Sequence, residues 1–223
     1  MTDLALPSGE TTGDFFRRAR ARLTLDVPAA LNDHAAQGRR GDLDLDPSLW
    51  ERAGVKATRP AAVLVPVVDR PAPMVLLTLR TELPSHPGQI AFPGGKIEPH
   101  DATPADAALR EAAEEIGLGR ALIEPIGYLD LYLTFSGYRI LPTVARVRSD
   151  YKLALSEAEV ADAFEVPLAF LMDAQNHALH SRDWKGVIRN YYAMPFGKRY
   201  IWGVTAGILR NLYERIYEES QDA

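Results

Sequence analysis

The sequence predicts a mixed α/β fold of the α+β type, in which one β-sheet packs against helices, and two observations predict it. Strand-like and helix-like runs follow one another along the 223 residues without the regular alternation of a doubly wound parallel sheet. This length allows one domain with a sizeable core but is short for two. Residues 1–57 are polar and irregular, and the first strong strand signal starts at Ala61. We therefore expect an N-terminal extension over 1–57 that packs on a main domain over 58–223.

The individual elements follow from hydrophobic periodicity and from the residues that break it. In the extension, residues 14–23 predict a helix. In the main domain, "AAVLVPVV" and "MVLLTLR" flank the turn "DRPAP" and predict a hairpin of strands over 61–68 and 74–80. A loop rich in proline and glycine follows. The later runs predict, in order, a helix over 104–116, strands over 126–133 and 138–147, a short helix over 156–164 and an amphipathic helix over 203–220.

The helix over 104–116 has clear start and stop signals. Thr103 suits the N-cap, Pro104 suits the first helical position, and Asp106 stands three residues after the cap, as in a capping box. Gly117 follows the last apolar residue, where glycine adopts the left-handed cap at the lowest cost. These signals predict both ends of the helix from local sequence.

Three glutamates lie close together on this helix, namely Glu111, Glu114 and Glu115. With about 100° per residue, they point away from its apolar face. Like charges four residues apart destabilise a helix by roughly 0.2–0.5 kcal/mol per pair, and the C-terminal end of a helix also disfavours anions. A solvated acidic face is one interpretation. A bound cation would remove both penalties, and clustered carboxylates suit Mg²⁺ or Mn²⁺, which often hold phosphates as well.

Gly94 and Gly95 come shortly before this helix, after the apolar run "QIAF". Because they lack a side chain, they let the backbone come close to a metal ion or a phosphate. The carbonyl oxygen of Gly95 is therefore a further candidate ligand. Arg110, beside Glu111, is a candidate to orient a carboxylate through a bidentate ion pair.

Composition excludes several classes of function. The chain has no cysteine, which rules out disulfides, thiolate zinc sites and cysteine nucleophiles, so any metal must bind oxygen or histidine. A net charge of -5 argues against a broad nucleic-acid interface. No stretch approaches the roughly 20 apolar residues of a membrane span, and the N-terminus lacks the pattern of a signal peptide. We therefore expect no nucleic-acid partner, no membrane contact and a cytoplasmic location, while the oligomeric state is not predicted.

Together, the glycines, the arginine and the acids resemble the signature of the Nudix hydrolase family. One acid of that signature is Asp101 here instead of glutamate, and eight residues rather than seven separate it from Arg110. The resemblance implies a Nudix fold, a mixed β-sheet sandwiched between α-helices. It also implies hydrolysis of a nucleoside diphosphate linked to another moiety. The matching residues are Gly95, Arg110, Glu111, Ala112, Glu114, Glu115, Gly117 and Leu118.

The stretch "LLTLRTELPSHPGQIAFPGG", residues 76–95, is similar to a second signature, which marks the coenzyme A pyrophosphatase branch of this family. Thr81 replaces a small residue of that signature, and the interval from Arg80 to Gly88 is one residue short and lacks an arginine. The resemblance covers about residues 58–212. It implies that coenzyme A or a derivative is cleaved to 3',5'-ADP and 4'-phosphopantetheine.

Two alternatives to coenzyme A hydrolysis stay open. The first keeps the chemistry and changes the substrate to ADP-ribose, NADH or another nucleoside diphosphate derivative, because the second signature is altered. The second belongs to another class of protein, a module that binds a nucleotide without hydrolysing it. Such modules usually lose acids of the Arg-Glu to Glu-Glu segment, and this chain keeps all of them.

The family resemblance also implies roles for individual residues. Glu111 and Glu115 are expected to be the principal ligands of Mg²⁺ or Mn²⁺, with Glu114 and the Gly95 carbonyl beside them. Arg110 is expected to orient the carboxylates.

Several residues are candidates for the general base and for the substrate contacts. The base is expected to be Glu111 or Glu114, since a carboxylate of the cluster can take a proton from water. Many members of the family instead use an acid from a distant loop, and Glu159 in "SEAEVADAF" is a candidate. The remaining candidates are Arg80, His86 and Gly94 for substrate binding, and Asp101 as a tentative site residue.

Overall fold

The computed structural model describes residues 10–33, 40–42, 44–46, 58–81, 88–184 and 186–218. Its helices are α1 (Thr12–Arg22), α3 (Pro104–Ile116), α4 (Leu168–Leu171) and α5 (Val204–Tyr217), with short 3-10 helices η1 (Ala29–Leu31), η2 (Arg120–Leu122) and η3 (Ala174–Asn176). Its strands are β1 (Arg40–Gly41), β2 (Arg59–Asp69), β3 (Met74–Arg80), β4 (Ile90–Ala91), β5 (Gly94–Lys96), β6 (Ile123–Tyr128), β7 (Tyr132–Leu133), β8 (Tyr138–Arg148), β9 (Val160–Pro167), β10 (Ala178–Trp184), β11 (Val187–Phe196) and β12 (Arg199–Trp202).

Nine of the described strands form one mixed sheet, in which β2 and β8 are parallel neighbours along their whole length. The predicted hairpin is confirmed, because β3 pairs with the end of β2 in the antiparallel sense. Near its start, β2 pairs instead with β5, while β3 continues beside β4 and β9. Among the described strands, β4 and β5 do not pair with each other. The sheet therefore opens between them, at the glycine pair of β5.

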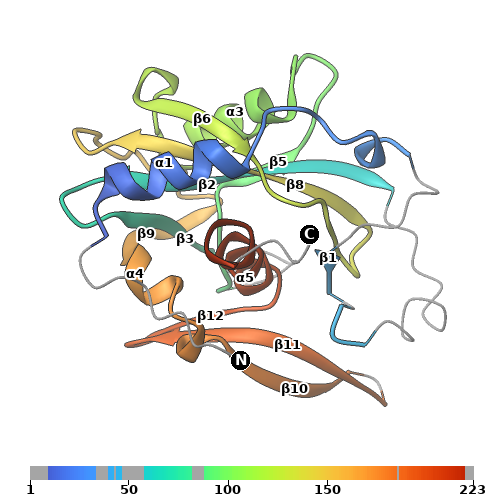
Figure 1. Ribbon diagram of the computed structural model, residues 1–223. Coiled ribbons are helices and arrows are strands. Elements are labelled where there is room, and N and C mark those ends of the chain that lie inside the picture. The colour runs from blue at the N-terminus through green and yellow to red at the C-terminus, as the bar shows by residue number, and fades with distance from the viewer. Residues whose placement is uncertain are drawn as a thin grey trace.

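Helices cover both faces of this sheet, as the predicted fold class requires. Alternate residues of β2 face opposite ways, so Ala62 and Leu64 pack with α3 while Val65 and Val67 pack with α5. Figure 1 shows α3 on one side of the sheet and α5 on the other. The prediction of a mixed sheet sandwiched between helices is confirmed.

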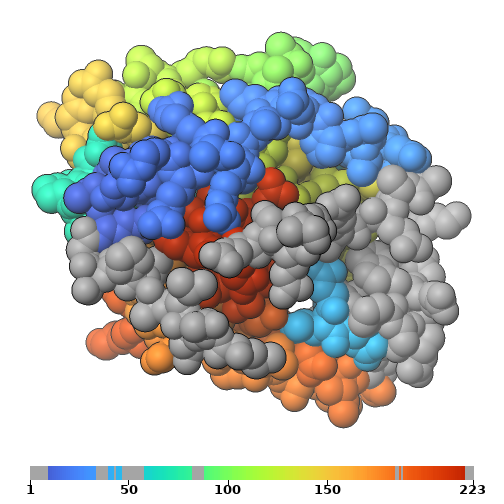
Figure 2. Space-filling view, viewed as in Figure 1, coloured from blue at the N-terminus to red at the C-terminus, as the bar shows by residue number. Residues whose placement is uncertain are grey.

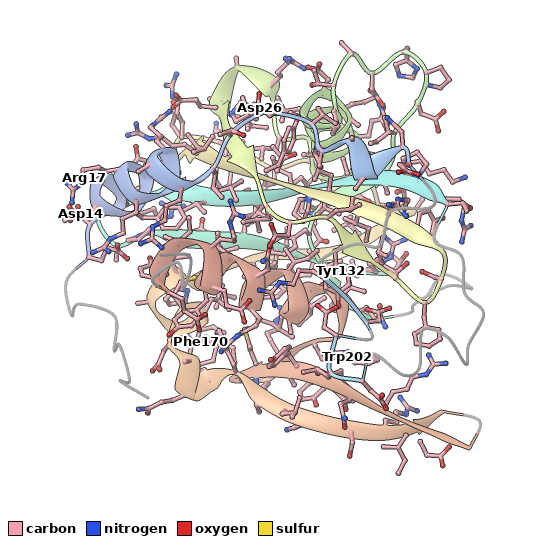
Figure 3. The ribbon with its side chains drawn as sticks, turned by 45° about the vertical axis from the view of Figure 1, so that its right-hand side comes forward. Asp14, Arg17, Asp26, Tyr132, Phe170 and Trp202 are labelled. Carbon is pink, nitrogen blue, oxygen red and sulfur yellow. The ribbon has the colours of Figure 1, made fainter. Side chains whose placement is uncertain are left out.

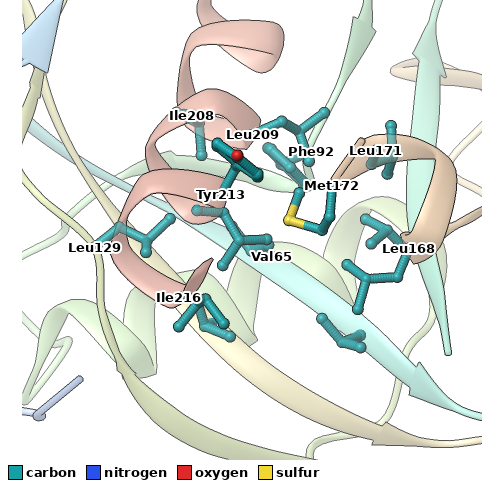
Figure 4. Close-up of a cluster of buried hydrophobic side chains, with 14 of the residues drawn as sticks. Val65, Phe92, Leu129, Leu168, Leu171, Met172, Ile208, Leu209, Tyr213 and Ile216 are labelled. Atoms are coloured by element: carbon teal, nitrogen blue, oxygen red, sulfur yellow. The ribbon is translucent and has the colours of Figure 1, made fainter. Parts of the chain in front are cut away.

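The helix α5 lies in the main hydrophobic core, between the large sheet and a second sheet (Figure 1). Leu209 and Ile216 of α5 are buried, together with Met172 after α4 and Val65 of β2 (Figure 4). Full burial of each such side chain contributes about 1.5–3 kcal/mol. The amphipathic pattern of residues 203–220 predicts this helix, and α5 confirms it. Within the described residues, no helix combines the length and the apolar character needed to cross a membrane.

The second sheet consists of β10, β11 and β12 in that order, all antiparallel. Met194 and Ile201 point from it into the core under α5. The rings of His180, Tyr191 and Tyr200 gather with Trp202, and His180 Nδ1 lies 2.7 Å from the Tyr200 hydroxyl. Sequence reasoning did not predict these strands, because polar residues interrupt the alternation expected of a strand in "ALHSRDW".

The described part of the N-terminal extension packs closely on the rest of the chain. Helix α1 starts at Thr12, two residues before the predicted start, because Thr11 and Asp14 form a capping box. Phe15 and Phe16 enter the same hydrophobic core as α5. Figure 2 shows α1 in blue lying against the red α5, whereas Asp14 and Arg17 lie together on its outer side (Figure 3). The domain boundary after residue 57 stays a prediction.

The predicted helix over 156–164 is wrong. Residues 157–159 form a turn, and from Val160 the chain continues as β9, which pairs with β3 in the antiparallel sense. The local sequence "SEAEVADAF" favours a helix, but pairing with a neighbouring strand buries Val160 and Val166 and outweighs that preference. This change places Glu159 on a turn rather than on a helix surface.

If α1 belongs to the folded core, replacing Phe15 by alanine should lower the free energy of unfolding by about 3–5 kcal/mol, because a fully buried ring leaves a cavity. Phe15 is 0% exposed, whereas the Arg17 side chain on the same helix is 73% exposed. Arg17→Ala is the matched control and should change stability by no more than about 0.5 kcal/mol. Urea unfolding measures both, and equal stability of the two variants would contradict the packing of α1.

Candidate active site

Helix α3 carries the acidic cluster and begins and ends where the sequence predicts. At its start, the Thr103 hydroxyl accepts the Asp106 N–H at 3.1 Å, and the Tyr128 hydroxyl accepts the Ala105 N–H at 3.2 Å. At its end, Gly117 adopts the left-handed conformation with φ of 68°. A methyl group on Gly117 would also lie 2.8 Å from Ala154, so the cap fits only glycine. The contact from Tyr128 has no signal in the local sequence.

Glu115 is the most buried acid of the cluster, at 4% exposure. Its Oε2 accepts the backbone N–H of Gly94 at a long 3.3 Å, and its Oε1 lies 4.0 Å from Nη1 of Arg80. Burial raises the pKa of Glu115 to about 7, because the carboxylate loses water and these two partners, the ones it has among the described residues, are weak. After burial, the charges of Glu111 and Glu159 raise this pKa further. A charged Glu115 therefore needs a stronger cationic partner.

Glu111 lies against the backbone of Gly95. A Cβ atom on Gly95 would meet Oε1 of Glu111 at 2.5 Å, so the absent side chain leaves the space that the carboxylate occupies. Burial also raises the pKa of Glu111, although Arg110 donates to its Oε1 at 3.0 Å. At the other glycine of β5, a Cβ atom on Gly94 would lie 2.6 Å from Cα of Val63. Both glycines are thus needed for close approach, Gly94 to β2 and Gly95 to Glu111.

Glu114 lies at the edge of the site. Its side chain is 59% exposed and accepts one hydrogen bond from Nη1 of Arg110 at 3.1 Å. The three glutamates that the sequence groups together therefore differ in exposure, because Glu115 is buried, Glu111 is partly buried and Glu114 is exposed.

Arg110 holds the acidic side chains of the site in place through hydrogen bonds. Its Nε and Nη2 donate to the two oxygens of Asp101, each at 3.0 Å, and Nη2 also donates to the carbonyl of Lys96 at 3.0 Å. Asp101 accepts the N–H of Glu98 as well, at 2.8 Å. The hydrogen bonds from Arg110 hold the pKa of Asp101 below its usual range. Asp101 thus orients Arg110 from the side opposite Glu111 and ties the loop before α3 to the helix.

Arg80 ends β3 beside Glu115. Its Nε is buried and has no hydrogen-bond acceptor among the described residues. A desolvated guanidinium donor without an acceptor costs free energy that an anionic ligand would recover. Of the other substrate-binding candidates, Gly94 lies at the site, and His86 lies outside the described residues.

Glu159 approaches Glu111 and Glu115 from a different segment of the chain. Its turn is anchored to the end of α3, because Ser156 donates its N–H to the Glu115 carbonyl at 2.8 Å. The Glu159 side chain is exposed, and its charge contributes to the raised pKa values of Glu111 and Glu115. The structure thus brings the distant acid to the cluster, although the helix predicted for it is absent.

A hard divalent cation fits this set of residues. Within the described ranges, no three His, Asp or Glu side chains already meet as a complete metal cage. Glu111 and Glu115 nevertheless supply carboxylate oxygens that Mg²⁺ and Mn²⁺ prefer, and the charge of Glu115 is poorly compensated. Mg²⁺ commonly binds through one or two carboxylates and completes its shell with water and substrate phosphate oxygens.

Comparison with known families and proteins agrees with this geometry. Residues 58–185 match the NUDIX domain. The chain is 37% identical over 161 residues to "Uncharacterized Nudix hydrolase NudL" of Yersinia pestis (strain Pestoides F), covering 71% of this chain and 80% of the relative. The same values hold for the protein of that name from Yersinia pseudotuberculosis serotype O:1b (strain IP 31758).

Solved structures with similar folds include two hydrolases. An Ap4A hydrolase binary complex from C. elegans has a TM-score of 0.41 and 21% identity, covering 51% of this chain and 82% of that one. A NUDIX hydrolase from Alicyclobacillus acidocaldarius has a TM-score of 0.42 and 22% identity, covering 51% and 81% respectively.

Replacing Gly95 by alanine should weaken Mn²⁺ binding at least tenfold, because the added methyl group would displace the Glu111 carboxylate. Titration of the free-ion electron paramagnetic resonance signal measures the affinity. Gly119→Ala is the matched control, because a Cβ there meets nothing within 4 Å. Equal Mn²⁺ affinity in Gly95→Ala and the control would show that Glu111 does not need this space.

In the metal-free protein, ionisation of Glu115 should oppose folding. Its pKa is about 7 in the folded chain against an ordinary 4.5, so the folded state keeps a proton that the unfolded state loses between these pH values. The free energy of unfolding should therefore fall as the pH rises from 4.5 through 7, by about 2–3 kcal/mol for this group. Urea unfolding in a chelator at pH 5 and pH 8 should show this extra loss in the wild type but not in Glu115→Gln. An equal loss of the free energy of unfolding in the wild type and in Glu115→Gln would contradict the raised pKa of Glu115.

Proposed function

This chain belongs to the Nudix hydrolase family, and we propose that it hydrolyses the diphosphate bond of coenzyme A or one of its derivatives with a divalent cation. The products are 3',5'-ADP and 4'-phosphopantetheine. The NUDIX match over residues 58–185 and the curated relatives at 37% identity support a diphosphatase. The coenzyme A part of the proposal rests on the similarity of residues 76–95 to the second signature.

The observation that carries the proposed chemistry is the buried carboxylate of Glu115 beside Glu111. Both have raised pKa values because of burial, and both lie at the glycine pair of β5. We assign Glu111 and Glu115 as the principal ligands of Mg²⁺ or Mn²⁺, with the Gly95 carbonyl and Glu114 beside them. Such an ion, when bound, supplies charge neutralisation at phosphoryl oxygens and lowers the pKa of bound water.

The two arginines have different tasks. Arg110 already has its donors satisfied by Asp101, Glu111, Glu114 and the Lys96 carbonyl, so it keeps the acids in place. Arg80 has a buried Nε without an acceptor in the described part of the chain, so it is the arginine that is free to bind a phosphate oxygen. The Gly94 backbone lies beside it, and His86 is proposed only from its place in the second signature.

Three acids are candidates for the general base, namely Glu111, Glu114 and Glu159. Glu111 is partly buried and hydrogen-bonded to Arg110, and Glu114 is exposed and bonded to the same arginine. Glu159 approaches from a turn that backbone hydrogen bonds hold in place. A fixed carboxylate near the site can take the proton of the attacking water, which is the role a general base requires.

The alternative substrates are ADP-ribose, NADH or another nucleoside diphosphate derivative. They are favoured by the interval between Arg80 and Gly88, which is one residue shorter than in the second signature and contains no arginine to bind a 3'-phosphate. A nucleotide-binding module without hydrolysis is less well supported, because Arg110 and all three glutamates are present. We also propose the cytoplasm as the location and residues 58–223 as the catalytic domain.

A panel of diphosphates tests the proposal directly. With Mg²⁺ or Mn²⁺, the purified protein should convert coenzyme A into two products with the masses of 3',5'-ADP and 4'-phosphopantetheine. ADP-ribose and NADH should be cleaved at least tenfold more slowly in kcat/KM. Preferred turnover of either one would replace the substrate, whereas binding of these compounds without cleavage of any would favour the nucleotide-sensing module.

A further inference from the structure

The turn that carries Glu159 is held from two sides by backbone hydrogen bonds. On one side, Ser156 donates to the Glu115 carbonyl at 2.8 Å, which ties the turn to the last residues of α3. Within the turn, Glu159 and Val160 both donate to the Ser156 carbonyl, at 2.9 and 2.8 Å. The backbone of Glu159 is therefore placed relative to the same helix that carries Glu111 and Glu115.

Thr81 holds the turn from its other side, at the end of β3. Its N–H donates to the Glu159 carbonyl at 3.0 Å, and its hydroxyl donates to the Ala158 carbonyl at 2.9 Å. One residue thus binds two successive carbonyls of the turn. A valine or alanine at this position would keep the first hydrogen bond and lose the second.

The pairing of β3 with β9 shows why the turn needs the two hydrogen bonds from Thr81. Leu79 pairs with Asp162 and Arg80 pairs with Val160, so a bulge adds one residue to β9 at this point. A bulge interrupts the ladder of hydrogen bonds and redirects the chain. Beyond the bulge, regular pairing between β3 and β9 does not continue into the turn. The two hydrogen bonds from Thr81 connect the turn to the end of β3 instead.

We propose that Thr81 is a positioning residue, which fixes the turn that carries Glu159 and so directs its carboxylate toward Glu111 and Glu115 for the hydrolysis proposed above. Thr81 acts only through Glu159 and does not touch the reacting atoms. The inference rests on the proposed function, and it selects Glu159 among the candidate bases. It also gives a role to the hydroxyl of Thr81, which stands at the position of the small residue of the second signature.

A double-mutant cycle tests the proposal. Thr81→Val should lower kcat about 3–10-fold with little change in KM, since it removes one hydrogen bond that positions the turn. Thr81→Ser keeps the hydroxyl and should retain kcat within about twofold. In a Glu159→Gln background, Thr81→Val should change kcat less than about twofold, because the residue that it positions can no longer act.

Two controls separate positioning from general stability. Thr78→Val removes a comparable bond on the same strand, from the Thr78 hydroxyl to the Ala91 carbonyl at 3.1 Å, and should keep kcat. Glu157→Gln, on the same turn, is the control for Glu159→Gln and should also keep kcat. Thermal unfolding of each variant confirms that it is folded, and Thr81→Ala serves as a second variant that also lacks the hydroxyl.

The outcomes distinguish this inference from the function on which it rests. If the wild type cleaves a diphosphate but Thr81→Val and Thr81→Ala keep its kcat, the positioning role is wrong. An equal loss of kcat from Thr81→Val with and without Glu159→Gln would also overturn it, because the effect would then not pass through Glu159. A wild type that cleaves no diphosphate would overturn the proposed function itself.

Discussion

The structure of the site depends on the cost of burying the Glu115 carboxylate. A carboxylate that loses most of its water without a close cationic partner is unfavourable, and the raised pKa of Glu115 reports that penalty. The fold keeps Glu115 buried despite this penalty, because α3 is tightly packed against the sheet. Small residues, Ala108 and Ala112, face β2 and let the helix approach the sheet, while Ile116 and Leu118 fill the space beyond. The hydrophobic contacts of α3 thus keep the Glu115 carboxylate buried, although it would otherwise be hydrated by solvent.

The remaining features of the site compensate this charge in part and leave the rest to a ligand. Arg110 is saturated with acceptors and keeps Asp101, Glu111 and Glu114 in fixed positions. Arg80 lies 4.0 Å from Glu115, and its buried Nε finds no acceptor in the described ranges. The opening of the sheet between β4 and β5 brings Gly94 and Gly95 to the same place. Negative and positive groups are therefore both present but incompletely paired, as expected of a site that binds a cation together with a phosphate.

The sequence predicted the parts of this site that depend on neighbouring residues. The limits of α3 were predictable because Thr103 and Gly117 act on the adjacent turn, and the acidic cluster was predictable from spacing. Contacts between distant segments were not. Three such contacts join residues far apart in the sequence. They are the strand pairing that turns the predicted helix over 156–164 into β9, the hydrogen bond from the Ala105 N–H of α3 to the Tyr128 hydroxyl, and the two hydrogen bonds from Thr81. The role of Asp101 as the partner of Arg110 likewise required the folded loop.

The central claim is that Glu111 and Glu115 form the cation-binding pair of a diphosphatase, and their kcat at saturating metal tests it most directly. Glu111→Gln and Glu115→Gln each keep the size of the side chain and remove its charge. Each variant should lose at least two orders of magnitude in kcat, while circular dichroism shows an intact fold. The exposed Glu124→Gln, whose side chain is 54% accessible, should keep the wild-type rate. Near-normal kcat in either variant at saturating Mg²⁺ or Mn²⁺ would contradict the assignment of Glu111 and Glu115 as the cation-binding pair.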